Sequence, residues 1–421
     1  MGLALMSAGS RANSLGDSHS DELSDRIRGL ILGSLIGDAF GGPIEFQDPR
    51  EIQALRDPPK NWGLQEVLDE EALNAAAARV SLRSYADLRP KPEPYAHWFA
   101  NAPAGTITDD SRHKFILLHA LRRSVSDPQR RLGLSQYAQA HLDWPVAALQ
   151  RNPEHTQLCN EWIEPWRRSA RWILGSRDLT QALPPMRMWN GVPTCCGQMS
   201  LPPLAAVFAG QPEAAYRAAY QLAFFDNGFG RDMNSALVAA LATALALPAA
   251  PRGDSDETAR KQMWEPVLKS LLSTDPYEYH AIPWMQRPVE YYLDFAFNAA
   301  DKAHARPGQL YATFDQEFQR TIKWEAQVPF AVVFGALAVA RYHPMAAMAL
   351  SIEWGHDTDS FAQLLGAFLG ARLGASVFPA DLRALVTRRL KQDAGEDVEE
   401  WVQVLVTAAE RAQQGTLMAV E

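Results

Sequence analysis

The most informative stretch of the sequence is Gly105-Thr106-Ile107-Thr108-Asp109-Asp110-Ser111. A second stretch, Gly355-His356-Asp357-Thr358-Asp359-Ser360, lies far along the sequence and has a similar composition. Each stretch places two carboxylates and at least one hydroxyl directly before a long apolar-periodic run, which predicts the start of a helix. Apolar residues such as Phe115 and Phe361 follow the acids, so we expect both helices to pack deep in a core.

The acids of these two stretches have two interpretations. Thr, Asp and Ser are favoured helix N-caps, and acids in a first turn complement the helix dipole, so each stretch alone could be a cap. A cap needs only one side-chain oxygen, however, and surplus carboxylates are costly to bury unless they are paired. Hard cations such as Mg²⁺ and Mn²⁺ prefer oxygen ligands. If the two stretches meet in space, we predict a metal site.

The composition limits the classes of protein to which the chain can belong. With 421 residues, 47% of them hydrophobic and 21% charged, the chain has the make-up of a soluble globular protein, as two or three domains or one large all-α domain. The net charge is −9 and no basic run occurs, which argues against nucleic acid as the primary partner. The three cysteines, Cys159, Cys195 and Cys196, lack metal-ligand spacing and fit a reducing, cytoplasmic setting.

The N-terminal residues do not resemble a targeting signal. Residues 1–20 lack a basic start and a long apolar stretch, so we expect a disordered segment here and not an export signal. No segment reaches the roughly 18 to 20 continuous apolar residues of a membrane helix, so we expect no membrane association.

A helix is predicted from Asp21, and its glycines have a regular spacing. Gly29, Gly33 and Gly37 recur every four residues, which in a soluble protein indicates that another helix backbone approaches closely. The helix ends at Gly41-Gly42-Pro43. Glu45, just beyond this end, is either a third acid of the metal site or a solvated loop residue.

The remaining pattern is helical throughout. We predict helices at about 71–78, 135–149, 159–174, 212–224, 235–247, 311–322, 328–341, 344–352, 379–391 and 395–413. No strand alternation is evident, so the fold class is all-α. We expect one helical domain over 21–378, with an insertion at about 47–104, and C-terminal helices over 379–421 packed on the same domain.

A glycine loop precedes the alanine-rich helix. The residues Asn227-Gly228-Phe229-Gly230 place glycine amides before a helix N-terminus, which favours a phosphate or diphosphate. A plain tight turn is the alternative. Asn227, Gly228 and Gly230 are therefore candidate substrate-binding residues.

Three motifs together resemble the ADP-ribosylglycohydrolase family. The residues from Arg28 to Glu45 are similar to the opening signature of that family. Thr108-Asp109-Asp110-Ser111 resembles its second motif and Gly355–Ser360 its third, in the family's order and over about residues 24–375. The loop Thr194–Ser200 corresponds to the family's glycine-rich loop and matches it at Gly197 and Met199, which adds Gly197 to the candidate substrate-binding residues.

The resemblance implies a compact all-helical domain with a binuclear Mg²⁺ or Mn²⁺ site at the bottom of an ADP-ribose cleft. It implies two Mg²⁺ ions, or Mn²⁺, held by metal ligands from both stretches: Thr108, Asp109, Asp110, Asp357, Asp359 and Ser360. The family usually has Thr where this chain has Ser360, and either supplies a hydroxyl. Glu45 matches the family's acid of the first motif, and Glu45 or Asp109 is the candidate catalytic carboxylate that accepts a proton or steadies charge at the anomeric carbon.

The implied activity is hydrolysis of the bond between ADP-ribose and an acceptor, with an ADP-ribosylated protein as the expected partner and a monomer as the expected state. Three alternatives are open. The chain could be a non-catalytic ADP-ribose-binding or crystallin-like relative, although its complete set of acids argues against that. It could act on another phosphorylated or nucleoside substrate. It could also be an immunity protein against an ADP-ribosylating toxin.

Overall fold

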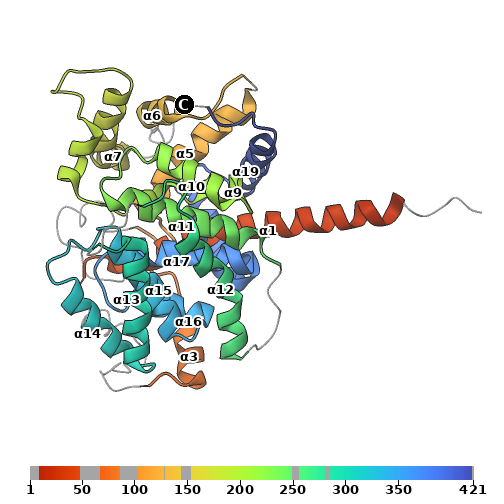
Figure 1. The fold of residues 1–421 in the computed structure, drawn as a ribbon, viewed down its shortest axis with the longest axis vertical. Coiled ribbons are helices and arrows are strands. Elements are labelled where there is room, and N and C mark those ends of the chain that lie inside the picture. Colours follow the sequence, from red (N-terminus) through yellow and green to blue (C-terminus); the bar gives the residue numbers. More distant parts are fainter. Residues whose placement is uncertain are drawn as a thin grey trace, which may run out of the picture.

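The fold consists of helices packed around two central ones (Figure 1). The computed structural model describes residues 9–47, 67–85, 102–127, 129–143, 153–248, 256–279 and 285–419. Within these ranges every regular element is a helix, and β pairing is limited to two isolated bridges, Leu132 with Met418 and Thr194 with Glu325. The all-α prediction is confirmed.

The helices follow in chain order. They are α1 (Gly9–Gly41), η1 (Gly42–Ile44), α3 (Glu70–Ala77), α5 (Asp109–Ser126), α6 (Leu134–Asp143), α7 (Pro153–Ile173), η4 (Pro185–Gly191), α8 (Cys196–Ser200), α9 (Pro203–Val207), α10 (Pro212–Leu222), α11 (Phe229–Ala246), α12 (Glu257–Ser273), α13 (Pro288–Ala303), α14 (Pro307–Glu317), α15 (Gln327–Val339), α16 (Pro344–Ser351), α17 (Thr358–Leu373), η5 (Ala375–Val377), α18 (Ala380–Asp393) and α19 (Val398–Gln413).

Most predicted helices agree with the structure to within a few residues, and three starts differ by more. Helix α7 begins at Pro153 and not at about residue 159. The predicted helix end at about residue 149 lies outside the described residues. Helix α11 begins at Phe229 and not at Ser235, since only Gly228, with φ of 54°, breaks the chain before it. Helix α1 begins at Gly9, so residues 9–20 are helical where a disordered segment was expected (Figure 1). No proline interrupts residues 9–20, and an existing helix extends more readily than a new one nucleates. Residues 1–8 lie outside the described ranges.

The centre of the fold is the antiparallel pair α1 and α17. A Cβ atom built on Gly33 would lie 2.0 Å from the carbonyl oxygen of Gly366, and one on Gly370 would lie 1.9 Å from that of Gly29. The two backbones are therefore in direct contact, as the glycine spacing predicted. Because the pair is antiparallel, the C-terminal end of α1 meets the N-terminal end of α17. There the Thr358 hydroxyl donates a 2.8 Å hydrogen bond to the Gly41 carbonyl.

Helix α1 also resembles a membrane helix by composition. The segment Asp21–Ile44 is long and apolar enough to cross a bilayer, but 89% of its apolar window is buried inside the protein. That burial is typical of the core helix of a soluble protein.

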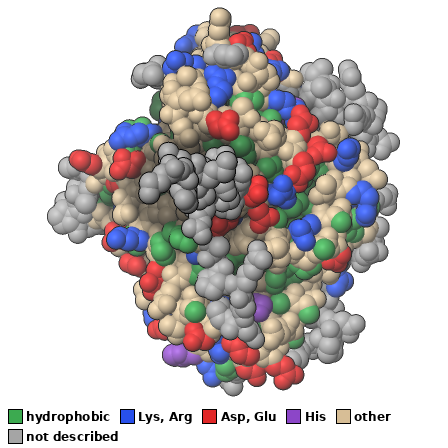
Figure 2. Space-filling view, turned by 90° about the vertical axis from the view of Figure 1, so that its right-hand side faces the viewer, with side chains coloured by type: hydrophobic (Ala, Val, Ile, Leu, Met, Phe, Trp, Pro, Cys, Tyr) green, Lys and Arg blue, Asp and Glu red, His purple; other side chains and the backbone are tan. Residues whose placement is uncertain are grey.

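The C-terminal helices pack on the same body. Helix α18 contacts α1, and α19 contacts α1, α5 and α9. On the face shown in Figure 2, acidic and basic side chains are interspersed among the described residues, without a large basic patch.

Candidate metal centre and cavity

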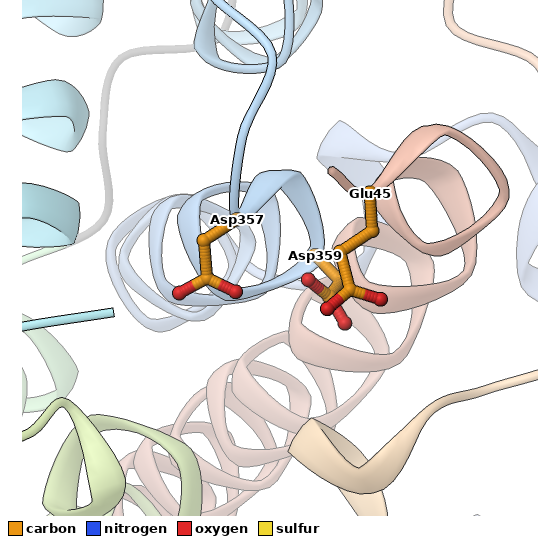
Figure 3. A group of neighbouring side chains, drawn as sticks. All are labelled: Glu45, Asp357 and Asp359. Carbon is orange, nitrogen blue, oxygen red and sulfur yellow. The ribbon is translucent and has the colours of Figure 1, made fainter. Parts of the chain in front are cut away.

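Three helix ends bring the predicted acids together. Glu45 follows η1, and the other acids belong to the starts of α5 and α17. Carboxylate oxygens of Glu45, Asp357 and Asp359 lie within 4.8 Å of one another, and so do those of Asp109, Asp110 and Asp359. Figure 3 shows the first of these groups. The two acidic stretches therefore meet in space, and Asp359 belongs to both groups.

Glu45 lies inside this cluster and not in a solvated loop. Its side chain is only 6% exposed. The backbone N–H of Phe46 donates a 2.6 Å hydrogen bond to the carbonyl of His356, which ties the chain after η1 to the start of α17. The structure therefore places Glu45 beside Asp357 and Asp359, and its role as a ligand or a catalytic carboxylate stays a prediction.

The two predicted hydroxyl ligands connect the acidic stretches. The Thr108 hydroxyl accepts a 3.2 Å hydrogen bond from the Asp110 amide as the N-cap of α5 and donates a 2.9 Å hydrogen bond to Asp359. The Ser360 hydroxyl donates to the Asp110 carboxylate, with an oxygen–oxygen distance of 3.2 Å. Capping and metal ligation are thus compatible roles for Thr108, since an oxygen has more than one lone pair.

Asp38 supports the cluster from the end of α1. Its carboxylate is fully buried and accepts hydrogen bonds from the amides of Thr108 (2.9 Å) and Ser111 (3.1 Å). These amides are at the N-terminus of α5, where donors lack partners within the helix. Burial raises the pKa of Asp38 above its ordinary value. Asp38 opposes the dipole of its own helix but satisfies the donors of α5, so it positions Asp109 and Asp110.

The carboxylates of the cluster repel one another. Burial, and then the charge of Asp359, raise the pKa values of Asp110 and Asp357 well above the ordinary value for a carboxyl group. Crowded carboxylates behave in this way when no cation is near. The ligand atoms are all oxygens, which hard divalent cations prefer. The residues present therefore fit the divalent cations that the resemblance implied.

Two polar residues beneath the acids were not predicted from the sequence. The Lys114 ammonium donates hydrogen bonds to the Asp110 carbonyl (2.9 Å) and to the Gln363 side chain (2.8 Å). Burial lowers the pKa of Lys114 to about 8. Lys114 follows Asp110 by four residues, and Gln363 follows Asp359 by four. This spacing places each pair on one helix face and is the signal that could have identified them.

A cavity of about 390 Å³ opens onto the acids. Its acidic part is formed by Glu45, Asp109, Asp110 and Asp357. Its aromatic part is formed by Phe46, His113, Trp166, Trp189 and Trp324, and the remaining lining residues are Pro165, Thr194, Cys195, Cys196, Met199 and Ser360. Small-molecule pockets in proteins have volumes of roughly 300–1,000 Å³ and a mostly apolar lining with a few polar groups. The cavity has the dimensions and lining of a ligand site.

Sequence reasoning missed the aromatic part of this cavity. The His113 and Trp166 rings stack with their centroids 4.0 Å apart, and burial lowers the pKa of His113 to about 3, so its imidazole is neutral. Trp189 and Asn190 both have φ between 50° and 60°, a left-handed conformation that asparagine adopts readily but that is uncommon for tryptophan. The dipeptide Asn190-Gly191 predicts a turn, but it does not predict that Trp189 lines the cavity.

None of the four candidate substrate-binding residues lines the cavity. The Asn227 side chain donates a 3.2 Å hydrogen bond to the Met188 carbonyl and so holds the segment that carries Trp189. Gly228 is exposed, and Gly230 packs against Pro193. Direct contact with substrate stays a prediction for these residues.

Gly197, the fourth candidate, is buried beside Asp226. Its amide donates a 3.1 Å hydrogen bond to the Asp226 carboxylate, and a Cβ atom there would lie 2.3 Å from the second carboxylate oxygen. Asn234 donates a 2.9 Å hydrogen bond to that second oxygen. The glycine is therefore required for the close approach that fixes the loop carrying Cys195.

We expect Asp226 to make the protein less stable as the pH rises from about 4 to about 7. Burial raises the pKa of Asp226 to about 7, against roughly 3.9 in an unfolded chain. The native state therefore binds the extra proton in this window, and the free energy of unfolding falls as that proton is lost. Urea unfolding in the presence of chelator at several pH values should show a shallower decline for Asp226→Asn. The exposed Asp301→Asn is the control, and equal declines in all three proteins would contradict the prediction.

The sequence was compared with protein families, curated proteins and solved structures. The sequence profile of the family described as ADP-ribosylglycohydrolase matches residues 19–415. A solved structure titled "ADP-ribosylglycohydrolase-related protein complex" is similar with a TM-score of 0.46 and 17% sequence identity, covering 93% of this chain and 99% of that one. No curated protein matches. Because the family match extends over most of the chain and includes all three acidic motifs, the chain belongs to the ADP-ribosylglycohydrolase family.

Proposed function

We propose that this protein hydrolyses the glycosidic bond between ADP-ribose and an acceptor, using two divalent cations held by the acidic cluster. One observation carries the proposal: Asp359 is shared by two groups of three carboxylates, each compact enough to hold a cation. A carboxylate common to both groups would allow one residue to serve as a ligand of two neighbouring cations. Membership of the family supports a glycohydrolase in general.

The two cations would be held by different groups of residues, which have Asp359 in common. Glu45, Asp357 and Asp359 would hold one cation, and Asp109, Asp110 and Asp359 the other, with the hydroxyls of Thr108 and Ser360 beside them. When bound, the cations supply Lewis acidity and lower the pKa of a coordinated water.

Two carboxylates have further roles in this proposal. Glu45 and Asp109 both line the cavity, so either is placed to accept the proton of an attacking water. A carboxylate that faces the anomeric carbon also stabilises the oxocarbenium-like charge that develops there as the glycosidic bond breaks.

The cavity favours a substrate with flat groups. Indole and imidazole rings offer faces on which a planar base or a cationic group stacks, and the acids lie within the same cavity. We propose an ADP-ribosylated protein as the substrate, Mg²⁺ as the cation with Mn²⁺ as a substitute, and a monomer acting in the cytoplasm. The acceptor is arginine, serine, another side chain or an acyl group.

The proposal is tested by release of ADP-ribose from arginine-linked and serine-linked ADP-ribosylated protein, with Mg²⁺ and with EDTA. We expect release from one of the two linkages, dependent on the cation, which would also identify the acceptor. Tight ADP-ribose binding without release from either linkage would contradict the hydrolase and favour a binding protein.

A further inference from the structure

One polar side chain on the cavity wall makes no hydrogen bond to the described part of the protein. His113 is only 5% exposed and lines the cavity. Its Nδ1 atom is buried and has no partner among the described residues. The Nε2 atom is not sealed in this way, so it is the ring nitrogen that is open to the cavity. Because buried polar side chains are nearly always paired, an imidazole in this position indicates a contact with the ligand.

Neighbouring rings fix the orientation of His113. Its ring stacks on that of Trp166, with centroids 4.0 Å apart and an angle of 23° between the planes. Trp166 in turn packs against Phe225 with a centroid distance of 4.3 Å, and both side chains are buried. A side chain held by its neighbours loses little conformational freedom on binding, so the direction of its hydrogen bond is set in advance.

The imidazole can lie beside bound cations without repulsion, since it is neutral. Burial is the largest cause of its pKa of about 3. A neutral imidazole has one nitrogen that donates and one that accepts, and the tautomer decides which is which. Nε2 can therefore donate a hydrogen bond to an oxygen or accept one from an N–H group.

The position of His113 along α5 relates it to the bond that is cleaved in the proposed reaction. His113 follows Asp109 by four residues, so the two side chains lie on one helix face, roughly 6 Å apart along the axis. Both line the cavity. In ADP-ribose the adenine is separated from the anomeric carbon by a diphosphate and a second ribose, whereas the acceptor is attached to that carbon directly. An acceptor is therefore the group that comes within one helical turn of Asp109.

The charges of the cavity wall agree with this placement. Among the described residues that line the cavity there is no lysine or arginine. A diphosphate is usually held by such side chains or by backbone amides at a helix N-terminus. The wall formed by His113 and Trp166 offers instead ring faces and one neutral nitrogen, which suit a side chain with a polar atom.

We propose that His113 is a specificity-determining residue, whose Nε2 atom forms a hydrogen bond with the acceptor side chain to which ADP-ribose is linked. This inference rests on the proposed function. An acceptor without a polar atom at this point would leave the nitrogen unpaired, and enzymes reject substrates strongly on that basis.

A second histidine of the same aromatic group provides a matched control. His141 stacks on Trp166 from a centroid distance of 5.6 Å, but it does not line the cavity. Its Nδ1 atom lies 2.9 Å from the Tyr137 carbonyl, to which it donates a hydrogen bond. Replacing His141 by phenylalanine therefore changes the aromatic group without changing the cavity wall.

The test compares the substrate with the product, because free ADP-ribose lacks the acceptor. The kcat/KM is measured for release from the ADP-ribosylated protein that the wild type cleaves, and the affinity for ADP-ribose by calorimetry with Mg²⁺. His113→Phe keeps a stacked ring and loses both nitrogens. We expect it to lower kcat/KM by about tenfold or more, with the ADP-ribose affinity of the wild type. His113→Gln, whose amide can replace Nε2, should recover much of the loss, and His141→Phe should behave as the wild type.

The outcomes separate this inference from the proposed function. An unchanged kcat/KM in His113→Phe, or an equal fall in its ADP-ribose affinity, would overturn the acceptor contact and leave the hydrolase in place. An equal loss of kcat/KM in His141→Phe would show that the rings act through packing and would also overturn the contact. A wild type that releases no ADP-ribose would overturn the proposed function and this inference with it. Retained affinity for ADP-ribose shows in each case that the variant is folded.

Discussion

Replacing Asp359 by asparagine is expected to remove cation binding and to lower kcat/KM for ADP-ribose release by about a thousandfold or more. The reason is geometric, because Asp359 is the one carboxylate common to both groups of acids. Its loss leaves each group with two carboxylates and removes the one residue that the two groups share. Metal ions stabilise transition-state charge by several kcal/mol, and roughly 4 kcal/mol corresponds to a thousandfold in rate.

The same substitution is expected to leave the fold intact. An asparagine oxygen can still accept the 3.0 Å hydrogen bond that the Ser360 amide donates to Asp359. One negative charge is removed from a cluster whose carboxylates repel one another, so the metal-free protein should unfold at the same temperature as the wild type or a higher one.

Three measurements examine this prediction: calorimetry with Mg²⁺, the release assay, and thermal unfolding in chelator. Asp381→Asn, on the exposed side of α18, is the matched control and should behave as the wild type in all three. Full activity in Asp359→Asn would refute the two-cation centre. A loss of activity that accompanies a large loss of stability would count against the role of Asp359 as a ligand.

Local patterns were sufficient to locate the acidic residues of the site. A hydroxyl and acids before an apolar run indicate a helix start, so the starts of α5 and α17 were predicted to lie at the two acidic stretches, where the structure has them. Four-residue glycine spacing predicted that another backbone approaches α1, although it did not identify α17 as the partner.

The rest of the site depends on contacts between distant segments. Trp166 belongs to α7, Trp189 to η4, and Trp324 precedes α15, yet all three line one cavity. The spacing of residues within one segment cannot predict that three distant segments line the same cavity. Gly197 shows the same limit, since the resemblance indicates the loop that carries it but not the buried Asp226 that accepts a hydrogen bond from its amide.

Substituting alanine for Gly33 is expected to lower the free energy of unfolding by about 3 kcal/mol or more. Added volume in a tight core typically costs about 1–3 kcal/mol, and here the obstacle is backbone, which cannot rotate away. The new Cβ atom would lie 2.0 Å from the Gly366 carbonyl oxygen and 2.6 Å from the Phe378 ring. The better helix propensity of alanine offsets only about 1 kcal/mol of this.

The matched control is Gly335→Ala in α15, where the new Cβ atom would meet the tip of the Phe314 ring at 2.8 Å and otherwise only ordinary contacts. A ring can shift by a few tenths of an ångström, so this variant should lose much less stability in urea unfolding. Separating α1 from α17 would also move Glu45 away from Asp357 and Asp359, which sit at the adjoining ends of the two helices. Gly33→Ala should therefore weaken Mg²⁺ binding without changing any ligand, whereas Gly335→Ala should not. Equal stability and equal Mg²⁺ affinity in the two variants would show that the helix contact does not set the geometry of the metal centre.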